Sequence, residues 1–164
     1  MALDLLASSE SGDNMGSKTR FQKAQAYLEL PERLDAIIKN KLIEQQQWWD
    51  MALSITAQMG GERVQSSGGK SKMSDAADRC FDAEREIDEA VAKFAQAKKE
   101  VIQTIERLEN PTWYKLLHKR YIQYIPLVDI ADEWGKDYTT ITTMHGRALQ
   151  SVQQILEEKN MGEH

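Results

Sequence analysis

A small residue and a glycine stand four positions apart between two apolar stretches of helical spacing near the end of the chain. They are Ala131 and Gly135. Two helices that cross steeply need a small residue where they meet, and the turn between them needs a residue that tolerates a left-handed backbone. The sequence therefore predicts two helices joined by a tight turn. Their apolar faces comprise Leu127, Ile130, Trp134, Ile141, Met144, Ala148 and Leu149.

A third helix is predicted immediately before this pair. The dipeptide Asn110-Pro111 is a helix start signal, because proline fits the first turn of a helix, where its missing N–H is not needed. Larger side chains then recur at helical spacing at Tyr114, Leu117, Tyr121 and Ile122. Three helices can close a small core, so we expect residues 110–158 to form a helix-turn-helix domain of three to four helices, followed by a short tail over 159–164.

Several motifs in this segment resemble the fourth conserved region of bacterial sigma factors. The matching residues are His118-Lys119-Arg120-Tyr121, Ile130-Ala131 followed by Gly135, and Arg147-Ala148-Leu149. Residues 20–158 as a whole further resemble small phage and prophage proteins of the sigma-region-four-like type, relatives of the RinA and ArpU late-gene activators. This resemblance implies a phage transcriptional regulator that contacts promoter DNA and host RNA polymerase in the bacterial cytoplasm.

The second helix of the pair, expected from Asp137 to about Glu158, is the candidate DNA-reading element. In a helix-turn-helix this helix enters the major groove, with its first residues toward base edges. Short polar side chains there can reach phosphates, base edges or thymine methyl groups, and nearby cations can contact phosphates. The predicted DNA-binding residues are Arg120, Lys136, Tyr138, Thr139, Thr140, Thr142, Thr143, His145 and Arg147.

The charge of this segment is low for a DNA-binding domain. Residues 111–164 contain six Lys or Arg and seven Asp or Glu, whereas an independent DNA-binding domain usually has a basic face. We therefore expect weak intrinsic affinity that a complex with polymerase would supplement. The sequence lacks a counterpart of the sigma region that melts promoters, which favours an accessory activator. Two alternatives remain open, a DNA-packaging adaptor resembling a small terminase subunit and a helical scaffold with a vestigial DNA-binding unit.

Two long helices are predicted before residue 110. The first runs from about Pro31 to Met59, and residues 21–30 either form a separate short helix or continue it through a kink at Pro31. The second, Ser74 to Leu108, carries a row of residues seven apart, a spacing typical of coiled coils. This row is Cys80, Ile87, Phe94, Val101 and Leu108, with Val91 and Ile105 on the interleaved positions.

These features predict an all-α protein whose first part is a long antiparallel helical hairpin over residues 20–109, with a loop at about 60–73. The apolar row of the first helix would face that of the second. It comprises Leu34, Ile37, Ile38, Leu42, Trp48, Trp49, Ala52, Ile55 and Met59. The hairpin is also the candidate surface for homo-oligomer formation. Residues 1–19 are expected to be a disordered tail, and both Met1 and Met15 remain candidate starts.

Other functional classes lack support in the sequence. No apolar run approaches the roughly 20 residues that a membrane span requires, so we expect no membrane association. Cys80 is the sole cysteine, which fits a reducing cytoplasm. The three histidines lack zinc-ligand spacing, and no catalytic set is apparent, so we expect a protein that is not an enzyme and needs no metal or cofactor. The Gly69-Lys70-Ser71 sequence is not a phosphate loop, because no strand precedes it.

Overall fold

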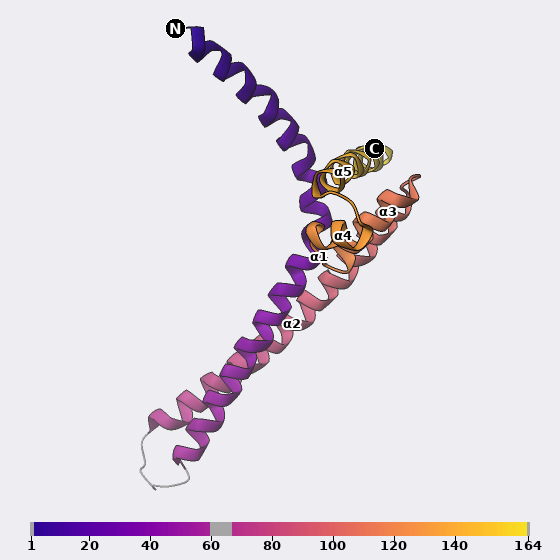
Figure 1. Ribbon diagram of the computed structural model, residues 1–164. Coiled ribbons are helices and arrows are strands. Elements are labelled where there is room, and N and C mark those ends of the chain that lie inside the picture. Colours follow the sequence, from indigo (N-terminus) through magenta and orange to yellow (C-terminus); the bar gives the residue numbers. More distant parts are fainter. Residues whose placement is uncertain (1, 60–66, 164) are drawn as a thin grey trace. The chain divides into compact units, whose positions relative to one another are not determined.

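The computed structural model describes the backbone of residues 2–59 and 67–163, and the side chains of residues 21–58 and 72–163. All regular elements within these ranges are helical, which confirms the all-α prediction (Figure 1). The elements are α1 (Ala2–Met59), α2 (Ser67–Glu106), α3 (Pro111–Leu117), the π-helical turn η1 (His118–Ile122), α4 (Leu127–Trp134) and α5 (Tyr138–Gly162).

The chain divides into two compact units. One, called the hairpin unit below, is Arg33–Gln96. The other, called the terminal unit, combines Met1–Glu32 with Ala97–His164. Helices α1 and α2 each contribute residues to both units, so the division does not follow the ends of the helices.

The two long helices begin earlier than expected. Helix α1 runs through Pro31 as one helix, which is one of the two alternatives that the sequence leaves open, and the proline ring is fully buried. Burial of the ring offsets part of the cost of the hydrogen bond that a proline removes from a helix. The helix begins at Ala2, where composition predicts a tail, and α2 begins at Ser67, before the expected Ser74. Residues 60–66 of the predicted loop lie outside the described residues.

The hairpin unit is an antiparallel pair of helices. Lys41 of α1 forms a salt bridge with Glu86 of α2. Further along α1, the ring of Trp48 lies 4.7 Å from the guanidinium carbon of Arg79. From the first contact to the second, the residue number increases along α1 and decreases along α2. The two helices therefore run in opposite directions, as the sequence predicts.

Helix α2 packs through two rows of residues. The first row is the one that the sequence predicts, and the second consists of other residues than those predicted. In the first row Cys80, Val101 and Leu108 are buried, while Ile87 and Phe94 are half-buried. The interleaved row was expected at Val91 and Ile105, but Val91 is exposed although Ile105 is buried. The buried or half-buried interleaved positions are instead Ala76, Ala83, Ala90, Ala97 and Thr104. Small residues let helices approach closely, so this row is set by size and not by hydrophobicity.

The terminal unit has a core built from both ends of the chain. Leu28 of α1, Ile105 of α2, Tyr121 of η1 and Val152 of α5 are all at most 1% exposed and belong to one cluster. A hydrogen bond of 2.9 Å between Tyr27 Oη and Thr104 Oγ1 joins α1 to α2 beside it. Residues on both sides of the boundary that the sequence predicts near residue 110 therefore contribute to this core.

Candidate nucleic-acid interface

The turn between α4 and α5 has the geometry that the sequence predicts. Gly135 ends α4 with φ of 59° and ψ of 37°, a left-handed backbone. The N–H of the next residue, Lys136, donates to the carbonyl of Ala131 at 2.9 Å. Ala131 is 2% exposed and packs with Leu116, Ile130 and Ile141 in a second small core. These contacts fix α5 against α3 and α4.

Helix α5 separates into a buried and an exposed face. Its buried residues are Ile141, Ala148, Leu149 and Val152. Its exposed face contains a row of polar residues at spacings of three and four, which are Thr140, Thr143, Arg147, Gln150 and Gln154. Thr139, Tyr138 and Lys136 are exposed at the start of the helix. The beginning of α5 thus presents neutral hydrogen-bonding groups and two cations to solvent.

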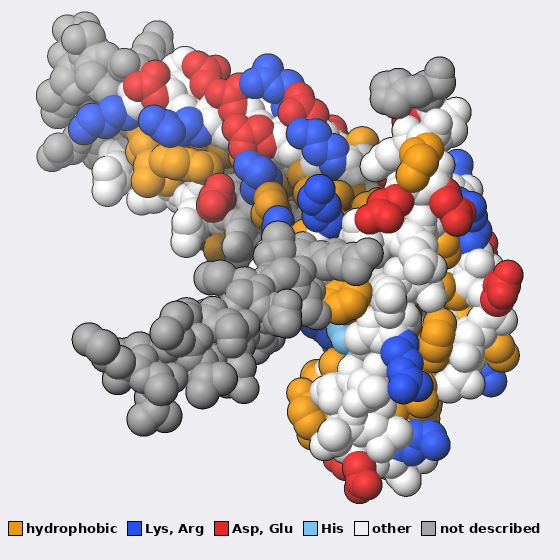
Figure 2. Space-filling view, turned by 90° about the horizontal axis from the view of Figure 1, so that it is seen from above, with side chains coloured by type: hydrophobic (Ala, Val, Ile, Leu, Met, Phe, Trp, Pro, Cys, Tyr) orange, Lys and Arg blue, Asp and Glu red, His pale blue; other side chains and the backbone are white. Residues whose placement is uncertain are grey.

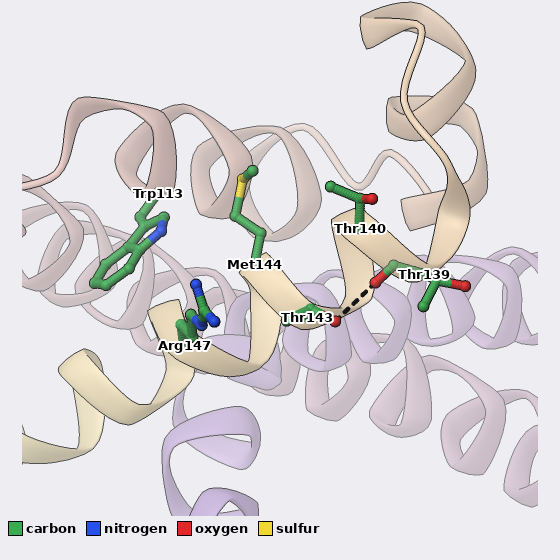
Figure 3. Close-up of a pocket in the computed structure, with 6 residues that line it drawn as sticks. All are labelled: Trp113, Thr139, Thr140, Thr143, Met144 and Arg147. Atoms are coloured by element: carbon green, nitrogen blue, oxygen red, sulfur yellow. Dashed lines mark hydrogen bonds between the residues drawn. The ribbon is translucent and has the colours of Figure 1, made fainter.

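The four threonines of this segment are not equivalent. The hydroxyl groups of Thr142 and Thr143 donate to the carbonyl of Thr139 at 3.0 and 2.9 Å, the second of which is drawn in Figure 3. Their hydroxyl protons are therefore engaged, which leaves the methyl groups and the oxygen lone pairs for a ligand. Within the described residues the Thr139 and Thr140 hydroxyl groups form no such bond, so these two can both donate and accept.

The cations predicted to contact DNA divide into two groups. Lys136 and Arg147 are exposed and form no ion pair with any residue that the structure describes. Arg120 instead binds Glu32 of α1 at 3.2 Å and lies 5.2 Å from the ring centroid of Tyr121. Only 24% of its side chain is exposed. The structure therefore engages Arg120 with α1 and with the ring of its neighbour Tyr121.

His145, also a predicted DNA-binding residue, lies on the inner side of α5. Its Nε2 atom is 2.7 Å from Tyr121 Oη, and the two rings stack with centroids 5.7 Å apart. Burial, and to a smaller extent the charge of Arg120, lowers the pKa of His145 to about 4. The imidazole is therefore neutral at pH 7 and supplies no positive charge for a phosphate. Its surroundings assign it to packing.

A shallow cavity of about 310 Å³ borders the exposed row (Figure 3). Its lining comprises Trp113, Thr139, Thr140, Thr143, Met144 and Arg147. Trp113 and Gln150 were absent from the sequence-based set of site residues. Trp113 lies outside the row of Tyr114, Leu117 and Tyr121 on which the third helix was predicted. Gln150 could have been found, because it continues the spacing of Thr140, Thr143 and Arg147.

Comparison with known proteins finds no matching family model, curated protein or solved structure. Within the part of the chain that the structure describes, no three or more His, Cys, Asp or Glu residues are grouped so that they could hold a metal ion. None of its described helices contains a stretch both long and apolar enough to cross a membrane.

Proposed function

We propose that the terminal unit binds double-stranded DNA, with α5 in the major groove, and that the protein is a phage-type transcriptional activator. The observation that carries the proposal is the exposed polar row of Thr140, Thr143, Arg147 and Gln150 on a helix held by the Gly135 turn. A glutamine can pair with adenine, and a threonine methyl can contact a thymine methyl, whereas the arginine is placed to contact a phosphate.

The charges of the terminal unit indicate weak binding to DNA by the protein alone, so that a second protein would have to hold it there. Lys119 and Arg120 are paired with Glu133 and Glu32, which leaves Lys136 and Arg147 as the cations beside the polar row. About two phosphate contacts give little affinity at physiological salt. The sigma-like motifs point to bacterial RNA polymerase as the protein that holds the activator at a promoter.

The first experiment asks whether the full chain selects a DNA sequence. A library of random duplexes is bound, washed and amplified over several rounds, and the enriched duplex is then titrated at several salt concentrations. We expect an enriched motif and a shallow salt dependence. Changing Arg147 to alanine should lower the slope of log K against log salt by about one unit. Lys159→Ala, at the far end of the same helix, is the matched control and should leave the slope unchanged.

A second experiment concerns polymerase. The full chain is tagged and incubated with purified bacterial RNA polymerase, with and without the enriched duplex. We expect co-purification and tighter DNA binding in its presence. Failure to enrich any motif, with or without polymerase, would overturn DNA reading by α5. Sequence-specific DNA binding that polymerase leaves unchanged would overturn the activator assignment alone.

A further inference from the structure

Large apolar side chains of the hairpin unit are exposed instead of buried. Within the described residues, thirteen large hydrophobic side chains are exposed, and nine of these lie between Arg33 and Gln96. Among the residues of that range whose side chains the structure describes, only Ala76, Cys80 and Ala90 are buried. Two helices alone thus leave these nine side chains substantially exposed to water, which is unfavourable for apolar surface. Such an exposed surface indicates an interaction site.

One row on α1 is particularly suited to packing. Leu42, Trp49 and Leu53 are separated by seven and four residues, which places them on one side of the helix, and they are 48%, 44% and 63% exposed. Met73 of α2, also exposed, lies 3.6 Å from Thr56, which is one turn beyond Leu53. The row therefore continues from α1 onto α2. Below, these four residues are called the Leu42–Leu53 face.

We propose that the Leu42–Leu53 face is the interface of a homodimer, so that a second copy of this chain covers it. The spacing of Leu42, Gln46, Trp49 and Leu53 is four, three and four, which reads the same in both directions. An antiparallel second α1 would therefore place Leu42 opposite the partner's Leu53. Such self-complementarity is what a two-fold interface requires.

The size and charge of the hairpin unit favour a second copy over other occupants. Between Arg33 and Gln58, α1 is about 40 Å long and about 10 Å wide. Together with α2 beside it, one whole side of the hairpin unit, which includes the Leu42–Leu53 face, offers roughly 800 Å², the area that each partner buries in a standard interface. Residues 33–96 contain nine Lys or Arg and eleven Asp or Glu, and both signs alternate on the visible surface (Figure 2). Because the two signs nearly balance, two copies of the unit would repel each other only weakly. The unit has no excess of positive charge that would attract a nucleic acid.

The test measures the mass of the full chain in solution by sedimentation equilibrium over a wide concentration range. We expect twice the monomer mass of 18.8 kDa. The double variant Leu42→Glu with Leu53→Glu should weaken dimerisation roughly a hundredfold, because it places carboxylates of the two chains opposite each other at both ends of the row. Both residues are exposed, so the helices should remain folded, as circular dichroism would show. Ile43→Glu is the matched control, since Ile43 is 58% exposed on the same helix but lies off the row.

Cysteine pairing gives an independent measurement. In a Cys80→Ala background, chains with Leu42→Cys are mixed with chains carrying Leu53→Cys and oxidised. Linked heterodimers should form, whereas an Ile43→Cys chain should not link to the Leu53→Cys chain. The proposal is overturned by a monomeric wild type at all concentrations, by equal loss of dimer in Ile43→Glu, or by linkage through position 43. None of these outcomes depends on DNA binding.

Discussion

Tyr121 and His145 are joined by a 2.7 Å hydrogen bond inside the terminal unit, and their rings stack. The pair links η1 to α5, the helix proposed to read DNA. Burial lowers the pKa of His145 to about 4, and burial also raises that of Tyr121. The folded protein therefore holds the neutral imidazole, and protonation of this histidine opposes folding.

We expect the stability of the protein to fall in acid because of this histidine. Its folded-state pKa lies below the unfolded value of 6.5. The stabilising contribution is therefore complete above pH 6.5 and is lost as pH falls toward about 4, with a total near 3 kcal/mol. Urea unfolding between pH 7 and pH 4 measures it. His145→Phe should flatten this dependence, whereas His118→Gln should retain it, and an unchanged slope in His145→Phe would contradict the expectation.

Gly135 and Gly146 provide a matched test of the turn. A Cβ atom at either position would meet nothing within 4 Å, so sterics with neighbours are not involved. At Gly135, with φ of 59°, alanine should destabilise the protein by about 1 kcal/mol because of the left-handed backbone. At Gly146, inside α5, alanine should stabilise by about 0.5–1 kcal/mol. Thermal unfolding measures both, and equal signs would mean that the turn geometry is wrong.

Arg120 should act on stability and not on DNA affinity. Its partner Glu32 is 41% exposed, so the pair should contribute about 0.5 kcal/mol, as partly exposed salt bridges do. A double-mutant cycle with Arg120→Ala and Glu32→Gln measures that coupling. The salt slope of DNA binding should stay at the wild-type value in Arg120→Ala, in contrast to Arg147→Ala. If the salt slope of Arg120→Ala were lower by one unit, Arg120 would contact a phosphate and this prediction would be wrong.

The free and engaged threonines should differ in sequence discrimination. Thr140→Ala removes a hydroxyl that is free within the described residues, so the preference for the enriched duplex over random DNA should fall by about 1 kcal/mol without a change in salt slope. Thr142 is half-buried and already bonded to Thr139, and Thr142→Ala should leave discrimination intact. The comparison is a competition titration. Equal losses in both variants would argue for a general effect on α5.

The sequence predicts the start or the end of a helix correctly wherever one residue type determines the backbone conformation there. The Asn110 side chain caps α3 by accepting the Thr112 N–H at 2.9 Å, and Gly135 ends α4, both as expected. The all-α fold and the antiparallel hairpin follow from residue spacing. These elements depend on neighbours within a few positions, so a single sequence contains the information.

Side-chain roles were less predictable where distant parts of the chain meet. Arg120 and His145 stand at sequence positions where a side chain could contact DNA. In the structure, however, Arg120 forms a salt bridge with Glu32, and His145 is hydrogen-bonded to Tyr121. The alanine row of α2 was missed because small residues have little hydrophobic signal. Likewise, nothing within residues 110–158 indicates that their core needs Leu28. Each of these outcomes is set by contacts between residues far apart in sequence.

The shared core of Leu28 and Val152 makes the order of synthesis important. More than 120 positions separate these residues, so a ribosome would release the first half of the core long before the second half exists. Closing such a long loop costs entropy before any contact offsets it, which slows folding. A chain that terminates before α5 could form the earlier helices, yet Leu28 would lack the α5 surface against which it packs. Helix α5, proposed to read DNA, is synthesised after the other helices of the terminal unit, so DNA binding would begin only once α5 has joined this core.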